Sequence, residues 1–213
     1  MIRALFIGSI GVLAETSLLQ RDCFNTAFKE AGLDWHWDTD QYRAMLATSG
    51  GRKRIEAYAA TRDESVDAQA IHARKSALFQ EHLQSGVDLR AGVADTLQAA
   101  RNQDMKIAFV TTTSRANVDQ VLRATKLPSD VFDVILDASM VGASKPDPQC
   151  YLIAMKGLDV IPQNIIVIED NPDGARAAQA ADLTPYVTPG ALHDASDFDP
   201  AVVFLDHMQI PET

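Results

Sequence analysis

Residues 4–16 read ALFIGSIGVLAET, and this stretch both opens the fold and raises its main question. Apolar residues 5–7 predict a buried strand, and the glycines that follow them indicate a loop at the end of that strand. In open α/β sheets ligands bind at the carboxyl ends of the strands, so a reactive side chain is expected there. The stretch nevertheless contains no aspartate, since the first aspartate of the chain is Asp22.

Strand and helix patterns alternate along most of the chain. Apolar runs predict strands at 2–8, 106–111, 132–137, 164–169 and 202–205. Helical patterns lie between the last four, for example at 116–125, 148–158 and 172–181. Asp147 and Asn171 each precede a proline and are predicted helix N-caps. This alternation predicts an α/β fold with a parallel, doubly wound sheet.

Residues 15–86 differ from the rest because they show no strong strand pattern. They predict helices at 16–31, 39–48, 52–61 and 66–85. An all-helical block between the first and second strands of a parallel sheet indicates an inserted domain. We therefore predict an α/β core made of residues 1–14 and 87–213, with a helical domain at 15–86.

Polar side chains follow three of the predicted strands. Thr111 and Thr112 are candidates for binding phosphate, as is Lys145 in a loop stiffened by prolines, while Glu169 and Asp170 are candidates for binding a hard cation. Each feature alone also fits an ordinary role, namely a strand threonine, a solvated lysine or the start of a turn. Their occurrence together, in this order and at successive strand ends, favours a phosphate-handling site.

This order of residues resembles the haloacid dehalogenase (HAD) superfamily of phosphatases and phosphomutases, over essentially the whole chain. The closer likeness is to its beta-phosphoglucomutase-like branch, especially the CbbY-type sugar-bisphosphate phosphatases. That likeness is carried by residues 23–28, 31–38, 50–55, 111–118 and 197–198. The resemblance implies a Rossmann-like core with a C1-type helical cap, Mg²⁺ as the cofactor and a small phosphorylated metabolite or inorganic phosphate as the ligand.

The resemblance fails at the tip of the first strand. The family pattern Asp-x-Asp-Gly-Val-Leu places its two aspartates at Gly8 and Ile10. In the family the first aspartate attacks phosphorus and binds Mg²⁺, and the second moves protons. Glycine offers no nucleophile, and isoleucine cannot supply acid–base catalysis worth about 10²–10⁴-fold. Strand alternation is expected to turn Ser9 to the opposite face, and Glu15 lies beyond the loop, so no catalytic residue is expected.

The loss of two carboxylates also changes the charge of the site. A complete family site, with four carboxylates, one lysine and Mg²⁺, carries one net negative charge. Glu169, Asp170 and Lys145 carry the same net charge with no metal. We therefore expect Mg²⁺ binding at Glu169 and Asp170 to be weak or absent, and an anion to bind without metal through Thr111, Thr112 and Lys145.

Gly51, Arg52 and Arg54 resemble the substrate loop of CbbY-type caps, which reaches the second phosphate of the substrate. The alternative is a turn followed by a solvated basic helix face. Trp35 and Trp37 are expected to pack inside the helical domain. The five histidines have no metal or triad spacing, and no chemistry is assigned to them.

Composition excludes several other classes of function. The net charge of −10 over 213 residues argues against nucleic-acid binding. No apolar run approaches the ~20 residues of a membrane span, so the cytoplasm is the expected location. Two distant cysteines indicate neither a disulfide scaffold nor a zinc site, and Gly8-x-x-Gly11 is not a dinucleotide-binding pattern.

The sequence predicts a CbbY-like protein that has lost hydrolase chemistry and binds or senses a phosphometabolite, that is, a pseudophosphatase. The alternative is an active Mg²⁺-dependent phosphatase acting on a small sugar phosphate, with Glu169 and Asp170 recruiting the metal. A third interpretation is a silent paralogue under little functional demand.

Overall fold

The computed structural model describes residues 1–46 and 50–211. The chain divides into two compact units, one formed by Met1–Glu15 with Gly86–Thr213 and one formed by Thr16–Ser85. We call the first the α/β unit and the second the helical unit. The helical unit is inserted in the chain between the first two strands of the α/β unit.

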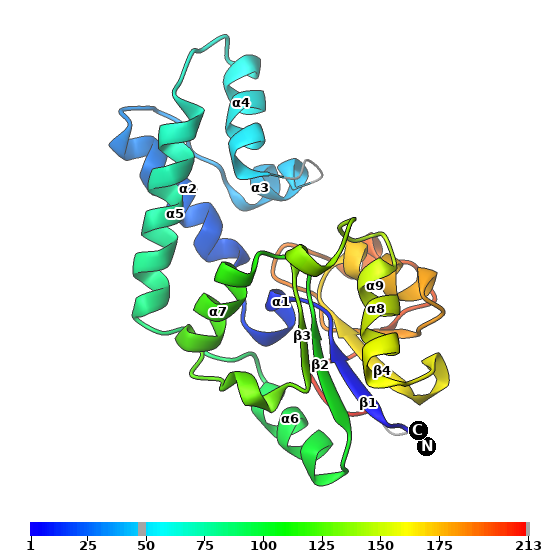
Figure 1. Cartoon of the computed structure of the whole chain (residues 1–213). Helices are drawn as coiled ribbons and strands as arrows, with labels where there is room; N and C mark the ends of the chain where they lie inside the picture. The colour runs from blue at the N-terminus through cyan, green and yellow to red at the C-terminus, as the bar shows by residue number, and fades with distance from the viewer. Residues whose placement is uncertain (47–49, 212–213) are drawn as a thin grey trace. The chain divides into compact units, whose positions relative to one another are not determined.

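A six-stranded sheet forms the centre of the α/β unit, in the order β3-β2-β1-β4-β5-β6 (Figure 1). All its strand pairs are parallel. The strands are β1 (Ala4–Ile7), β2 (Lys106–Val110), β3 (Val134–Leu136), β4 (Ile165–Glu169), β5 (Pro185–Val187) and β6 (Val203–Phe204). Ile7 of the central strand aligns with Phe109 of β2 and with Ile168 of β4. The register therefore brings the ends of β1, β2 and β4 side by side.

Helices cover both faces of this sheet (Figure 1). They are α1 (Ile10–Leu13), α6 (Val93–Asn102), α7 (Arg115–Ala124), α8 (Gln149–Leu158) and α9 (Pro172–Ala180). Phe6 packs in one buried cluster with residues of α8 and α9, while its neighbours Leu5 and Ile7 pack in a second cluster with residues of α6 and α7. This alternation confirms the predicted doubly wound α/β fold.

The local predictions succeed in part. Asn171 caps α9 as predicted: its side chain accepts a hydrogen bond from the Gly174 amide, and Pro172 is the first helical residue. Helix α8 begins one residue later than predicted, at Gln149, although the Asp147 carboxylate does accept from the Gln149 amide. Strand β5 was not predicted, because it is only three residues long and begins with a proline.

The helical unit contains α2 (Ser17–Glu30), α3 (Thr39–Met45), α4 (Gly51–Thr61) and α5 (Ala68–Gln84). The end of the helix predicted at 39–48 lies outside the described residues. Trp37 is fully buried between Phe24 and Phe28, with ring centroids 5.0 and 4.6 Å away, and Trp35 is also buried. Both tryptophans therefore serve packing, as predicted. Within the described ranges, no helix has the length and apolar character that a membrane crossing requires.

Candidate functional site

The tip of β1 is built differently from the expectation for Ser9. The strand ends at Ile7, and Ser9 is the N-cap of the short helix α1. Its hydroxyl donates to Asp170 Oδ1 over 2.5 Å. The expectation that Ser9 turns to the opposite face from residues 8 and 10 relied on strand alternation, which does not apply after Ile7. Ile10 is half-buried and packs against the apolar core.

Lys145 lies at the centre of the strand ends, with its side chain only 7% exposed. Its ammonium donates to Glu169 Oε1 over 2.6 Å and to the Val110 carbonyl over 3.0 Å. It also contacts the Gly8 carbonyl and lies 3.2 Å from the Tyr151 hydroxyl. An ammonium has three protons, and these four oxygens are enough to engage all of them.

Glu169 is fully buried beside this ammonium. The Tyr151 hydroxyl donates to the same Oε1 atom over 2.5 Å. Burial raises the pKa of Glu169, and the nearby Asp170 charge adds to this, while the Lys145 ammonium opposes it. Burial also raises the pKa of Tyr151, which therefore remains a hydrogen-bond donor. We call Lys145, Glu169 and Tyr151 the buried triad.

The Glu169 carboxyl lies in space that only glycines leave open. A Cβ atom added to Gly8 would overlap this carboxyl and would lie 2.5 Å from the Tyr151 hydroxyl. A Cβ atom added to Gly174 of α9 would overlap the same carboxyl from another side. The side chain of Glu169 therefore occupies the position that a side chain at residue 8 would need.

Asp170 is also bound within the protein. Its Oδ1 atom accepts from Ser9 and, over 2.7 Å, from the Asn171 side chain, and a Cβ atom on Gly11 would overlap its carboxyl. Mg²⁺ requires a near-octahedral set of oxygens at ~2.0–2.1 Å, most often with open positions for water. Among the described residues, no group of three or more metal-ligating side chains can hold an ion. The Glu169 Oε1 and Asp170 Oδ1 atoms already accept hydrogen bonds from groups of the protein, and this arrangement of donors does not fit a Mg²⁺ site.

Thr111 follows β2 and is almost fully buried. Its amide donates to the Leu136 carbonyl, and its hydroxyl oxygen accepts from the Thr113 amide over 3.1 Å. Thr112 is half-buried in the same turn. The structure thus places Thr111, Thr112, Lys145 and Glu169 at adjacent strand ends, and their binding of phosphate remains a prediction.

The three residues predicted in the cap loop belong to α4 of the helical unit. Gly51 is the first helical residue. Arg52 is exposed and lies 3.4 Å from Glu56, as on a solvated helix face. Arg54 is only 7% exposed, with its guanidinium over the Tyr42 ring and its Nε atom donating to the Met45 carbonyl. Of these three residues, therefore, only Arg54 has a side chain that is buried within the helical unit.

Lys75 of α5 is a second buried cation, and the sequence analysis missed it. Its side chain is 6% exposed, donates to Gln20 Oε1 over 2.9 Å and lies over the rings of Phe24 and Phe79. Burial is the main cause that lowers the pKa of Lys75 to about 8, and the nearby Arg54 contributes in the same direction. In the part of the chain that the structure describes, no carboxylate forms an ion pair with Lys75.

A signal for Lys75 was present in the sequence. Ile71, Lys75 and Leu78 are spaced four and three residues apart, so they share one helix face. Burial lowers the pKa of His72 as well, and Lys75 and Arg54 contribute to that shift. We call Arg54, His72 and Lys75 the basic cluster of the helical unit.

Arg90 is another residue that the sequence analysis missed. Its guanidinium donates to the carbonyls of Gly11, Thr188 and Pro189 over 2.8–3.0 Å. It therefore joins α1, which follows β1, to the loop after β5. Nothing in the local sequence indicates this role, because all three partners are distant backbone groups.

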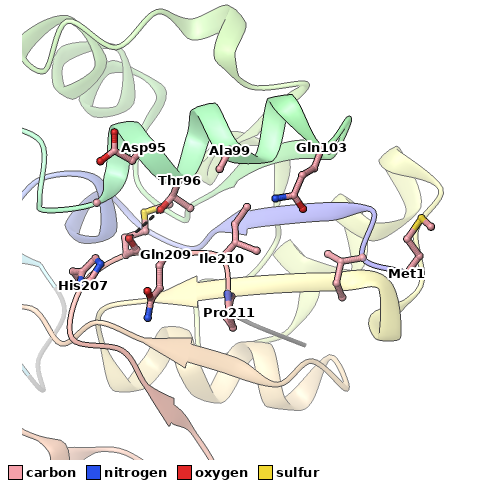
Figure 2. Close-up of a pocket in the computed structure, with 12 residues that line it drawn as sticks. Met1, Asp95, Thr96, Ala99, Gln103, His207, Gln209, Ile210 and Pro211 are labelled. Atoms are coloured by element: carbon pink, nitrogen blue, oxygen red, sulfur yellow. Dashed lines mark hydrogen bonds between the residues drawn. The ribbon is translucent and has the colours of Figure 1, made fainter.

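A separate cavity of about 850 Å³ lies along α6 and the C-terminal segment 207–211 (Figure 2). Asp95 and Thr96 line it from α6, as does Gln103 directly after that helix, and the Thr96 hydroxyl donates to the Met208 carbonyl over 2.9 Å. None of the candidate site residues lines this cavity, so it is separate from the strand ends.

Comparison with known proteins shows the family of this chain. A family model described as haloacid dehalogenase-like hydrolase matches residues 11–187, beginning directly after Gly8 and Ile10. This chain belongs to that family. Its members generally use Mg²⁺. The resemblance found in the sequence is thereby confirmed.

Several relatives lie in the CbbY branch of the HAD family. Protein CbbY of Cereibacter sphaeroides is 36% identical over 97% of this chain and 92% of its own length. Protein CbbY of Rhodobacter capsulatus is 36% identical over 94% of this chain and 91% of its own length. The crystal structure of CbbY from Rhodobacter sphaeroides in complex with phosphate matches with a TM-score of 0.81 and 36% identity, over 97% of this chain and 95% of that chain. A mutant form of the same protein is described in complex with xylulose-(1,5)bisphosphate.

Proposed function

We propose that this HAD-family chain is a CbbY-like protein that has lost hydrolase chemistry and acts by binding a phosphorylated metabolite. One observation carries the proposal: Gly8 and Ile10 replace the two aspartates, and the Glu169 carboxyl fills the space over Gly8. A phosphoryl group above β1 would meet neither a nucleophile nor a proton donor. No catalytic residue is assigned.

Ser9 does not replace the missing nucleophile in this proposal. Its hydroxyl donates to Asp170, and a carboxylate is a weak base for a serine hydroxyl. The Ser9–Asp170 hydrogen bond instead supports a structural role at the start of α1.

We place the principal anion affinity on the helical unit. At the strand ends two carboxylates face one ammonium, and the Glu169 carboxylate already neutralises that ammonium. In the helical unit Lys75 is buried, and no ion pair with a described carboxylate neutralises it. A buried cation is costly unless it is paired, so an anionic ligand would complete this cluster. Thr111, Thr112 and Lys145 remain a proposed secondary contact for phosphate.

The chemical class of the ligand follows from the relatives. CbbY from Rhodobacter sphaeroides is described with phosphate and with xylulose-(1,5)bisphosphate. A small sugar bisphosphate is therefore the ligand class that we propose, with one phosphate at Arg54 and Lys75. Gly51 at the N-terminus of α4 supports this placement, since a helix N-terminus favours anions.

Binding without metal is the expected result of a calorimetric titration. Wild-type protein in EDTA should bind inorganic phosphate and xylulose bisphosphate, and Mg²⁺ should change the dissociation constants by less than about twofold, or ~0.4 kcal/mol. The reason is that the proposed contacts are cations and amides, which need no bridging metal. Affinity that appears only with Mg²⁺ would contradict the proposal and would favour an active Mg²⁺-dependent phosphatase.

A further inference from the structure

The surroundings of the Lys145 ammonium resemble those of a bound cation. Four oxygens face it, from one carboxylate, two backbone carbonyls and one phenol. Carboxylate and carbonyl oxygens are the ligands that hard cations take in proteins. The ammonium thus holds together the ends of β1, β2 and β4, through Gly8, Val110 and Glu169.

The inward position of Glu169 depends on the missing side chain at residue 8. Its carboxyl fits between Gly8 and Gly174, and a Cβ atom at either position would overlap it. The loss of the residue-8 side chain therefore creates the space in which Glu169 meets Lys145. Glycine at residue 8 therefore has two effects. It removes the carboxylate that would be the nucleophile, and it leaves the space that the Glu169 carboxylate occupies.

A divalent ion at this position would compete with the ammonium. Glu169 Oε1 already accepts from both Lys145 and Tyr151, and the side chain is fully buried. The Asp170 Oδ1 atom accepts hydrogen bonds from Ser9 and Asn171. A metal ion bound to Glu169 Oε1 and Asp170 Oδ1 would have to displace these partners and lie beside a positive charge in a poorly hydrated space.

We infer that in this chain the Lys145 ammonium has replaced the divalent cation as the permanent counter-ion of the strand ends. This goes beyond the proposed function, because it concerns what neutralises the acidic pair whether or not a ligand binds. Lys145 is then a positioning residue, which holds three loops together through Glu169 and two carbonyls.

The test is the Mg²⁺ dependence of thermal unfolding in wild type and in Lys145→Met. The melting temperature of wild type should move by less than about 1 °C between EDTA and 10 mM Mg²⁺, since a non-binding ion gives no stabilisation. Lys145→Met leaves a buried carboxylate unpaired and should melt about 10 °C lower in EDTA. Mg²⁺ should restore several degrees of this loss, because the vacated position now accepts a cation.

Two controls separate this inference from a purely structural role. Lys156→Met removes an exposed lysine of α8 and should respond to Mg²⁺ as wild type does. Lys145→Met combined with Glu169→Gln removes both charges. This double variant should recover at least half of the decrease in melting temperature that Lys145→Met causes, and Mg²⁺ should not change its melting temperature. The inference would be overturned if Mg²⁺ raised the melting temperature of wild type by several degrees. It would also be overturned if Lys145→Met folded and its melting temperature did not change with Mg²⁺. If that single variant does not fold, the wild-type titration and the double variant decide the question.

Discussion

Lys75→Met is expected to stabilise the ligand-free protein while removing most of its affinity for phosphate. The amine is buried, and its pKa is lowered from 10.5 to about 8, so the folded state carries the charge at a cost. At ~1.4 kcal/mol per pKa unit, a shift of this size corresponds to roughly 3–4 kcal/mol at pH 7. Methionine has a similar length and packs well against aromatic rings, so it should fill the site without that cost.

The pH dependence of this effect has a defined sign. Between pH 8 and 10.5 the unfolded chain binds more protons at Lys75 than the folded chain does. The free energy of unfolding of wild type should therefore rise with pH across this window, relative to Lys75→Met. Below about pH 8 the difference in free energy of unfolding between the two proteins should stay constant. Above pH 10.5 the part of this difference that comes from the Lys75 charge should disappear.

Denaturant unfolding at several pH values, combined with phosphate titrations, checks this prediction. Phosphate affinity should fall at least tenfold, or ~1.4 kcal/mol, in Lys75→Met. Lys29→Met is the matched control, because Lys29 is exposed on α2 of the same unit, and it should leave both quantities unchanged. A destabilised Lys75→Met protein that binds phosphate normally would show that Lys75 serves packing alone.

Gly8→Ala is expected to destabilise the α/β unit by about 3 kcal/mol, although it adds a single methyl group. The new Cβ atom overlaps the Glu169 carboxyl and approaches the Tyr151 hydroxyl to 2.5 Å. Glu169 must then leave its buried position, and its ion pair with Lys145 is broken or strained. The free energy of unfolding in urea measures this loss.

Gly157→Ala provides the opposite result as a control. Gly157 lies inside α8, where an added Cβ atom meets nothing within 4 Å. Alanine there should stabilise by up to ~1 kcal/mol through helix propensity. If Gly8→Ala is as stable as wild type, Glu169 does not occupy the space over residue 8. With Glu169 in that space, Gly8→Asp should not simply restore the family site, because Glu169 would have to move first.

The sequence was sufficient for the α/β fold because that fold depends on local periodicity. Buried strands contain continuous apolar runs, such as residues 165–168 of β4, and the Asn171-Pro172 pair contains both the cap and the first helical residue. The apolar and polar pattern at these positions leaves little choice of secondary structure. Strand β5 escaped prediction because a three-residue strand carries too short a pattern.

The geometry of the candidate site depends on contacts that no local pattern contains. The Lys145–Glu169 ion pair joins residues 24 apart, and the Ser9–Asp170 hydrogen bond joins residues 161 apart. The sequence indicated that Gly8 lacks a side chain, but it could not show that Glu169 would fill the resulting space. The Ser9–Asp170 contact could not be predicted for the same reason, since the end of β1 is set by its neighbours in the sheet.

The most direct test of the account is phosphate release from xylulose bisphosphate by purified wild type in Mg²⁺. With Gly8 and Ile10 at the two aspartate positions, release should not exceed the buffer background. An Asp170→Asn protein, prepared identically, reports any contaminating phosphatase. Release at ~1 s⁻¹ or faster, abolished both by EDTA and by Asp170→Asn, would contradict the loss of hydrolase chemistry.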